Sequence, residues 1–293
     1  MFKVSKLQQY PEKYRRIIFF LLIALLCVSL GRAYQCLFWD IPIRSLLWNE
    51  ELLAPMISLF FGMSWSEYLL HPSANLVIQS LVTSIGIGLI VCCITFLLTT
   101  SRSLNFISLH LIFGLLIFIA LLYHLEKFRT AGQFLEYTLQ FMTPLILWQL
   151  LKYGITEAWI YLLKICIALT FVSHGLYALG FYPVPGNFVA MTIQILHCND
   201  TFAIQFLMVV GILDLIFSLG LFLGGRVFKW SIIYCIAWGA LTAFARIVAN
   251  VEMDIFGSTM HQWAFETVYR IPHFTVPIVL YFAIKQQDRR AHE

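Results

Sequence analysis

Five arginine and histidine side chains fall within or next to strongly apolar stretches, where a polar group is costly and therefore a candidate for function. They are Arg32, His124, His174, Arg246 and His273. All five lie near the same predicted end of their stretches, so we expect them to reach a similar depth. Their donors could then hold an anionic or carbonyl-bearing head group, for instance that of a quinone or a lipid, in one cavity. Alternatively, the arginines extend to the lipid–water boundary and backbone carbonyls satisfy the histidines.

A lysine and an aspartate inside two successive apolar stretches form a second constellation. At about 1.5 Å per helical residue, Lys164 lies about 10 Å and Asp214 about 14 Å from the predicted inner ends of their helices. A lysine stem can cover that difference in depth. The sequence therefore predicts an intramembrane ion pair between Lys164 and Asp214, which either relays protons or ions or only fixes helix register.

The remaining polar motifs exclude several chemistries. His110 and His124 have a spacing suited to stacked haems, but no second stretch carries a matching pair. A single haem between His124 and His174 is the one haem arrangement left open. The seven cysteines show no CxxC spacing, so no metal site is predicted, and hydrolase and ATPase motifs are absent. Glu266 and Arg270, four residues apart, are expected to form an ion pair on a helix surface.

Eight apolar stretches, each expected to cross a bilayer, must position these residues. Hydrophobic residues make up 60% of the 293 residues and charged residues 12%, a composition that a soluble domain could not bury. Because a spanning segment must satisfy its own backbone polar groups, we predict an all-α polytopic membrane protein. The predicted spans are 17–38, 76–98, 104–124, 132–151, 157–180, 202–223, 231–250 and 270–285.

The distribution of positive charge predicts how the chain is oriented. Basic residues in the N-terminal arm, in three predicted turns and in the C-terminal tail fall on one side, so both termini are expected in the cytoplasm and the protein in the inner (plasma) membrane. The first span lacks a cleavage site and is expected to stay uncleaved. The net charge of +4 forms no basic patch, so we expect the lipid bilayer and not nucleic acid as a partner. The basic residues on the predicted cytoplasmic side are Lys3, Lys6, Lys13, Arg15, Arg16, Arg102, Lys152, Arg226, Lys229, Lys285, Arg289 and Arg290. Lys127 and Arg129 fall on the other side.

Recurring landmarks indicate that the chain is an internal repeat. Gly86 precedes Arg102 by 16 residues, and Gly211 precedes Arg226 by 15. Because each half would contain four spans, the two four-helix repeats would be parallel, related by an axis along the membrane normal. Each half also has a long apolar connection on the outer side, where we expect any elaborate site. The predicted repeats are 1–151 and 152–293.

The second half resembles a known family. It carries Phe171-Val172-Ser173-His174-Gly175 and then Gly211-Ile212-Leu213-Asp214-Leu215, which is similar to the DoxX-like membrane proteins over about 157–285. The resemblance implies a four-helix bundle, a role for His174, Gly175 and Asp214, and, in some members, association with quinone-linked oxidoreductases or periplasmic enzyme maturation. The first half is more distantly similar to the eight-helix membrane domain of vitamin K-dependent carboxylase-like proteins, with Gly31-Arg32 in place of the His-Gly.

These observations favour one function over two alternatives. We expect an accessory subunit that binds a quinone or another lipophilic head group in an outward-facing cavity and works with a redox or envelope protein partner. The alternatives are an ion-coupled transporter or permease that uses the Lys164–Asp214 pair, and a structural membrane anchor of an envelope complex. No catalytic residue is predicted.

Overall fold

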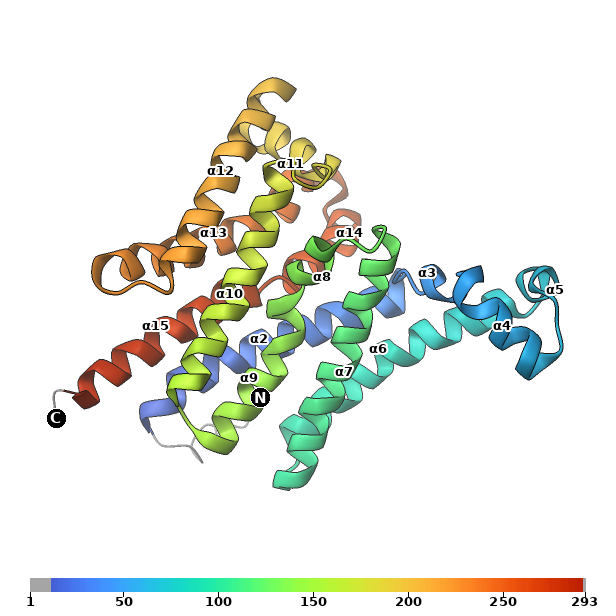
Figure 1. Ribbon diagram of the computed structural model, residues 1–293, viewed down its shortest axis with the longest axis horizontal. Helices are drawn as coiled ribbons and strands as arrows, with labels where there is room; N and C mark the ends of the chain where they lie inside the picture. Colours follow the sequence, from blue (N-terminus) through green and yellow to red (C-terminus); the bar gives the residue numbers. More distant parts are fainter. Residues whose placement is uncertain (1–11, 292–293) are drawn as a thin grey trace.

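The computed structural model describes residues 12–291, and over this range every regular element is helical (Figure 1). Seven of the described segments are long and apolar enough to cross a membrane, which confirms an all-α, multi-pass membrane protein. The seven are Tyr14–Phe38, Ala74–Leu98, Arg102–Glu126, Glu157–Ala178, Asp200–Gly220, Gly225–Asn250 and Met253–Asp288.

The elements follow one another through short turns and longer outer connections. They are α2 (Glu12–Phe38), α3 (Arg44–Leu47), α4 (Glu50–Phe61), α5 (Trp65–Leu70), α6 (Ala74–Leu98), α7 (Arg102–Glu126), α8 (Ala131–Glu136), α9 (Thr138–Tyr153), α10 (Glu157–Ala178), α11 (Gly186–Leu196), α12 (Asp200–Gly220), α13 (Gly225–Asn250), the 3-10 turn η1 (Met253–Ile255), α14 (Phe256–Val268) and α15 (Pro272–Ala291).

The predicted span 132–151 is not one continuous helix. It is divided between α8 and α9 at Tyr137, which leaves α9 with 16 residues. At the start of α9, the Leu139 N–H donates to Thr170 Oγ1 on α10 over 3.2 Å, which satisfies a backbone donor that the helix itself cannot pair.

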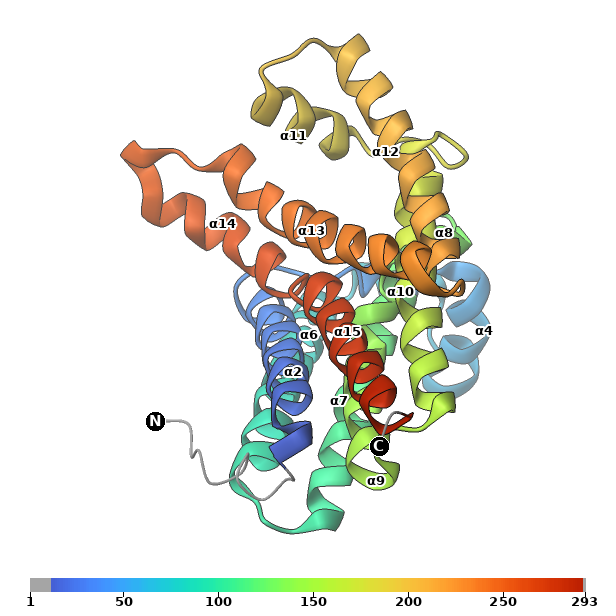
Figure 2. The ribbon, with the colours of Figure 1, turned by 90° about the vertical axis from the view of Figure 1, so that its left-hand side faces the viewer.

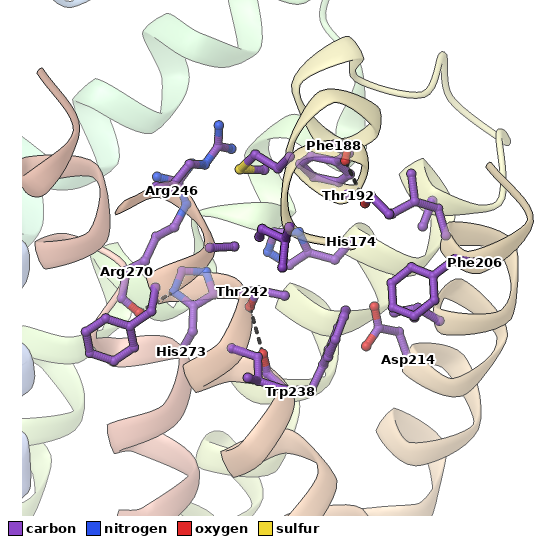
Figure 3. Close-up of a pocket in the computed structure, with 18 of the residues that line it drawn as sticks. His174, Phe188, Thr192, Phe206, Asp214, Trp238, Thr242, Arg246, Arg270 and His273 are labelled. Atoms are coloured by element: carbon purple, nitrogen blue, oxygen red, sulfur yellow. Dashed lines mark hydrogen bonds between the residues drawn. The ribbon is translucent and has the colours of Figure 1, made fainter. Parts of the chain in front are cut away.

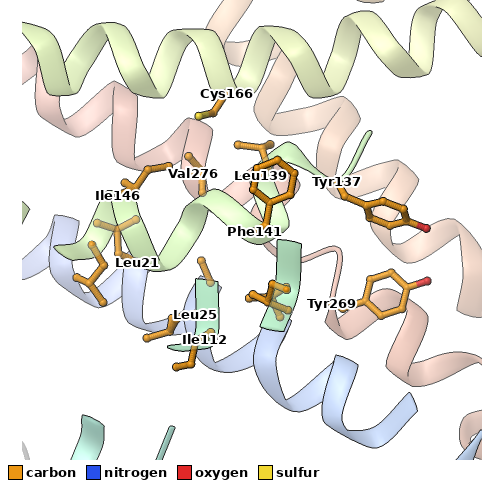
Figure 4. Packing of buried hydrophobic residues seen from close by; sticks show 14 of the residues in the cluster. Leu21, Leu25, Ile112, Tyr137, Leu139, Phe141, Ile146, Cys166, Tyr269 and Val276 are labelled. Carbon is orange, nitrogen blue, oxygen red and sulfur yellow. The ribbon is translucent and has the colours of Figure 1, made fainter. Parts of the chain in front are cut away.

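Helices α2, α9, α10 and α15 meet in the centre of the bundle and carry much of the apolar core (Figure 4). Helices α6 and α7 complete one half, and α12 and α13 the other. The packing in the two halves corresponds: α2 packs on α6 as α10 packs on α12, and α7 packs on α9 as α13 packs on α15. The short helices cross between halves, since α8 packs on α10 and α14 packs on α2.

Small residues allow the closest helix approaches, as is common between membrane helices. A Cβ atom added to Gly211 on α12 would lie 2.9 Å from the carbonyl oxygen of Gly175 on α10. The reverse substitution would place a Cβ 2.8 Å from the Gly211 oxygen and 3.1 Å from the Cβ of Asp214. This crossing therefore brings Asp214 against the helical turn of α10 that begins with His174.

The ends of the bundle agree with the predicted sidedness. Helix α2 begins and α15 ends on the same side as the α6–α7 and α9–α10 turns, whereas α11 lies toward the opposite end (Figure 2). Helices α4 and α5 extend away from the bundle on that outer side (Figure 1). Lys3 and Lys6 of the predicted basic arm lie outside the described residues. The compartment that each side faces stays a prediction.

Candidate functional site

A cavity of about 370 Å³ lies in the second half of the chain, between α10, α11, α12, α13 and the start of α15 (Figure 3). Its walls are mostly aromatic and aliphatic, as is typical of sites for small lipophilic molecules. Three wall residues on α13, namely Leu241, Phe244 and Val248, are also exposed on the outside of the protein. The cavity thus borders a surface that would face lipid. Its polar lining residues are Glu136, His174, Thr192, Asp214, Thr242, Arg246, Arg270 and His273.

Two histidines from different helices face each other in this cavity. The ring centres of His174 on α10 and His273 on α15 are 5.6 Å apart. The Nε2 atom of each ring is buried and has no hydrogen-bond partner among the described residues. The other nitrogen of His273, Nδ1, lies 2.8 Å from the carbonyl oxygen of Arg270, so it must carry the proton and donate. Two imidazole nitrogens are therefore available to a bound molecule.

A glycine holds the backbone that carries His273 close to α13. A Cβ on Gly239 would lie 2.5 Å from the carbonyl oxygen of His273, so the two helices can approach this closely only with glycine there. Gly239 is one residue after Trp238, whose ring also lines the cavity. The same close contact thus positions a polar and an aromatic wall residue.

Two arginines share one carboxylate beside the histidines. Arg246 Nε lies 3.4 Å and Arg270 Nη1 3.1 Å from the same oxygen, Oε2 of Glu266. The predicted Glu266–Arg270 ion pair is thus confirmed, but Arg270 is buried and lines the cavity, whereas the sequence placed it on a helix surface. The helical spacing revealed the pair, and only the packing of α14 and α15 against the bundle revealed its burial.

A buried glutamate, Glu136, also lines the cavity and was not predicted. It accepts a hydrogen bond from Gln133 Nε2 over 3.3 Å. It is the last residue of α8. The sequence did carry a signal for it, because Glu136 is an ionisable residue inside the predicted span 132–151.

Asp214 lines the same cavity and is 2% exposed. Its Oδ1 accepts a hydrogen bond from the Tyr234 hydroxyl over 2.8 Å. In Figure 3, Asp214 lies on one side of the histidine pair, and Arg246 and Arg270 lie on the other. The two arginines and Asp214 therefore lie at opposite ends of the cavity, with the imidazoles between them.

The predicted ion pair between Lys164 and Asp214 is wrong. No ion pair within 4.0 Å joins them in the described part of the chain, and Lys164 Nζ lies instead 5.2 Å from the ring centre of Phe228. The Gly175–Gly211 crossing explains this, because it places Asp214 level with Gly175. Lys164 is 11 residues earlier on α10, which is about 16 Å along the helix axis.

Arg32 does not line the cavity, and it does not extend to the lipid–water boundary either. It is 1% exposed and forms its own cluster. Its Nε and Nη2 donate to Gln140 Oε1 over 3.1 and 2.7 Å, and its Nη1 donates to Gln35 Oε1 over 2.7 Å. The guanidinium carbon lies 3.7 Å from the ring centre of Tyr269 and 4.8 Å from that of Tyr137. Amide oxygens and aromatic ring faces therefore stabilise this buried cation.

His124 is also separate from the cavity lining. Its Nδ1 lies 3.0 Å from the carbonyl oxygen of Thr130, so a backbone carbonyl satisfies it, as the alternative interpretation of the histidines predicted. No ring contact joins it to His174 within the described residues. Three of the five predicted residues, His174, Arg246 and His273, therefore come together in one cavity.

The described residues contain no group of three or more His, Cys, Asp or Glu side chains that could hold a metal ion. Comparisons with protein-family models, with curated proteins and with solved structures gave no match to this chain.

Proposed function

We propose that this protein binds a lipophilic molecule with a polar head group, such as a quinone or a lipid, in the cavity of its second half. One observation carries the proposal: two histidine Nε2 atoms are buried between apolar walls and have no hydrogen-bond partner in the described part of the chain. A buried polar atom without a hydrogen bond costs about 1–3 kcal/mol. A bound head group would remove that cost, and the aromatic walls would hold the apolar part of the molecule.

The position of the cavity favours a ligand that arrives through the bilayer. Helix α13 contributes wall residues that are also exposed on the lipid-facing surface, and the amphipathic helix α11 covers the cavity from the outer side with Phe188, Met191 and Thr192. A molecule dissolved in the outer leaflet could thus enter sideways. A water-soluble ligand would have to pass α11.

We also propose that the two halves are parallel repeats, as the sequence predicted. Equivalent glycine contacts support this. A Cβ on Gly86 would meet the Ala33 oxygen, the Cys36 Cβ and the Leu37 Cγ. A Cβ on Gly211 would meet the same three atom types in Gly175, Ala178 and Leu179. This register makes Arg32, which precedes Ala33, the counterpart of His174, which precedes Gly175.

The same correspondence extends to α9 and α15. Each helix contains one proline beyond its first turn, Pro144 or Pro277, and Gln140 and His273 lie four residues before them. Arg32 bonds to Gln140 just as His174 lies beside His273. In the proposed repeat, the Arg32 side chain therefore occupies in the first half the place that is a cavity in the second half.

We propose that the protein works as an accessory subunit with a redox or envelope protein partner, in the inner membrane with both termini cytoplasmic. The DoxX-like resemblance agrees with the site, because His174, Gly175 and Asp214 all lie at the α10–α12 crossing that forms the cavity. The transporter alternative has lost the ion pair on which it depended. A structural anchor stays the main alternative, and it requires no ligand.

The test is to purify the protein in mild detergent and to measure retained quinone and lipid by native mass spectrometry and solvent extraction. His174→Ala and Arg246→Ala should each lower the retained ligand about tenfold, as expected for one lost hydrogen bond or charge contact. Arg246→Ala leaves Glu266 paired with Arg270, so the fold should persist. The control is His110→Ala, because His110 is exposed on α7 and its ring contacts Trp148 away from the cavity. Equal ligand retention in all four proteins would contradict the proposal.

A further inference from the structure

The geometry points to a ligand whose head group donates a hydrogen bond, which is a hydroxyl-bearing lipophile such as a phenol, a hydroquinone or a long-chain alcohol. This inference rests on the proposed function and narrows its ligand class. A head group with acceptors alone, such as an ether, would leave the buried imidazole nitrogen of His273 unsatisfied.

The hydrogen bond from His273 to the backbone sets the preference for a head group that donates. A carbonyl oxygen can only accept, so the Nδ1–H of His273 donates to the Arg270 oxygen. In the neutral ring, Nε2 is then an acceptor with a free lone pair. His273 is 3% exposed, and its Nε2 has no partner among the described residues. The matching group on a ligand is an O–H or N–H.

The hydroxyl groups of the lining cannot supply that donor. The Thr242 hydroxyl donates to the carbonyl oxygen of Trp238 over 2.9 Å, and the Thr192 hydroxyl donates to that of Phe188 over 2.8 Å. Both protons are thus already used within their own helices.

None of the charged side chains of the lining binds Nε2 of His273 among the described residues. Arg246 Nε and Arg270 Nη1 bind Glu266, and the other N–H groups of the two guanidiniums can bind an acceptor atom of the same ligand. Asp214 Oδ1 accepts a hydrogen bond from the Tyr234 hydroxyl. The acceptor that no described residue satisfies is Nε2 of His273, and a hydroxyl satisfies it without adding a buried charge, while the hydroxyl oxygen can itself accept from an arginine N–H.

The experiment compares 4-nonylphenol with its methyl ether, 4-nonylanisole, in which a methyl group replaces the hydroxyl proton. Binding of each to the full-length protein in lipid nanodiscs is measured by equilibrium dialysis. The wild type should bind the phenol about tenfold more tightly than the ether. In His273→Phe, which keeps an aromatic ring, this difference should disappear. In the control His110→Phe it should persist.

The outcomes separate this inference from the proposed function. Equal, saturable binding of the phenol and the ether to the wild type would overturn the donor requirement and leave a lipophile-binding site. Saturable binding of neither probe would overturn both proposals. If His273→Phe does not fold, the wild-type comparison alone still decides between the first two results.

Discussion

Replacement of the buried Arg32 by alanine gives a stringent test of the first-half cluster. The change leaves Gln140 Oε1 without its two donors, and an unsatisfied buried amide oxygen costs about 1–3 kcal/mol. It also removes the cation 3.7 Å from the Tyr269 ring centre, a contact of about 2 kcal/mol when desolvated. We therefore expect Arg32→Ala to lower the free energy of unfolding by about 3–5 kcal/mol.

Equilibrium unfolding of detergent-solubilised protein with sodium dodecyl sulfate measures this loss. The matched control is Arg102→Ala, because Arg102 is exposed at the start of α7, and it should change the free energy of unfolding by less than about 0.5 kcal/mol. Arg32→Lys keeps the charge but cannot present two donors in a plane to Gln140, so it should restore less than half of the loss. A loss below about 1 kcal/mol in Arg32→Ala would refute the reasoning, since the cluster would then carry little of the stability.

Three further perturbations address the second half. Gly211→Val should lower the free energy of unfolding by about 1–3 kcal/mol, because the added side chain forces α10 and α12 apart. The control is Gly114→Val, at a glycine with open space around it, which should be nearly neutral in the same denaturation assay. Glu266→Gln removes the carboxylate that two arginines share, and we expect a loss of about 2 kcal/mol together with weaker ligand retention, because the cations are then uncompensated. Lys164→Met and Asp214→Asn should act additively on stability within about 0.5 kcal/mol, and a double-mutant cycle with a larger coupling energy would show that the two residues interact after all.

Much of the architecture could be predicted from hydrophobicity alone. Long apolar stretches force the backbone into helices, and the structure confirms a multi-pass helical membrane protein. The predicted span 132–151 is divided at Tyr137, and the Leu139 N–H at the start of α9 bonds to Thr170 of another helix. Such a tertiary bond leaves no mark in the hydrophobicity of the segment.

The sequence predicted site residues correctly where their depth along a helix was enough to place them. It did not where the rotation of a helix, or the crossing of two helices, decided which side chains meet. His174, Arg246 and His273 were predicted at similar depth, and all three line the cavity. Arg32 satisfied the same depth criterion, but it points into a separate cluster. The Lys164–Asp214 pair failed for a related reason, because the close approach at Gly211 sets the relative height of α10 and α12 and the sequence could not reveal that height.

The residues between the two halves connect the proposed repeat with a single open site. Tyr137 and Arg270 each lie seven residues before their helix proline, and Glu136 and Tyr269 each lie eight residues before. Tyr137 and Tyr269 pack on Arg32, whereas Glu136 and Arg270 line the cavity. At each of these two equivalent positions, one repeat thus carries a tyrosine that packs on Arg32, and the other repeat carries a charged residue that lines the cavity. In the first half, two aromatic rings hold the Arg32 cation, which fills the place equivalent to the cavity. In the second half, two charged residues keep the cavity polar. A fold with two equivalent places would therefore bind one ligand per chain.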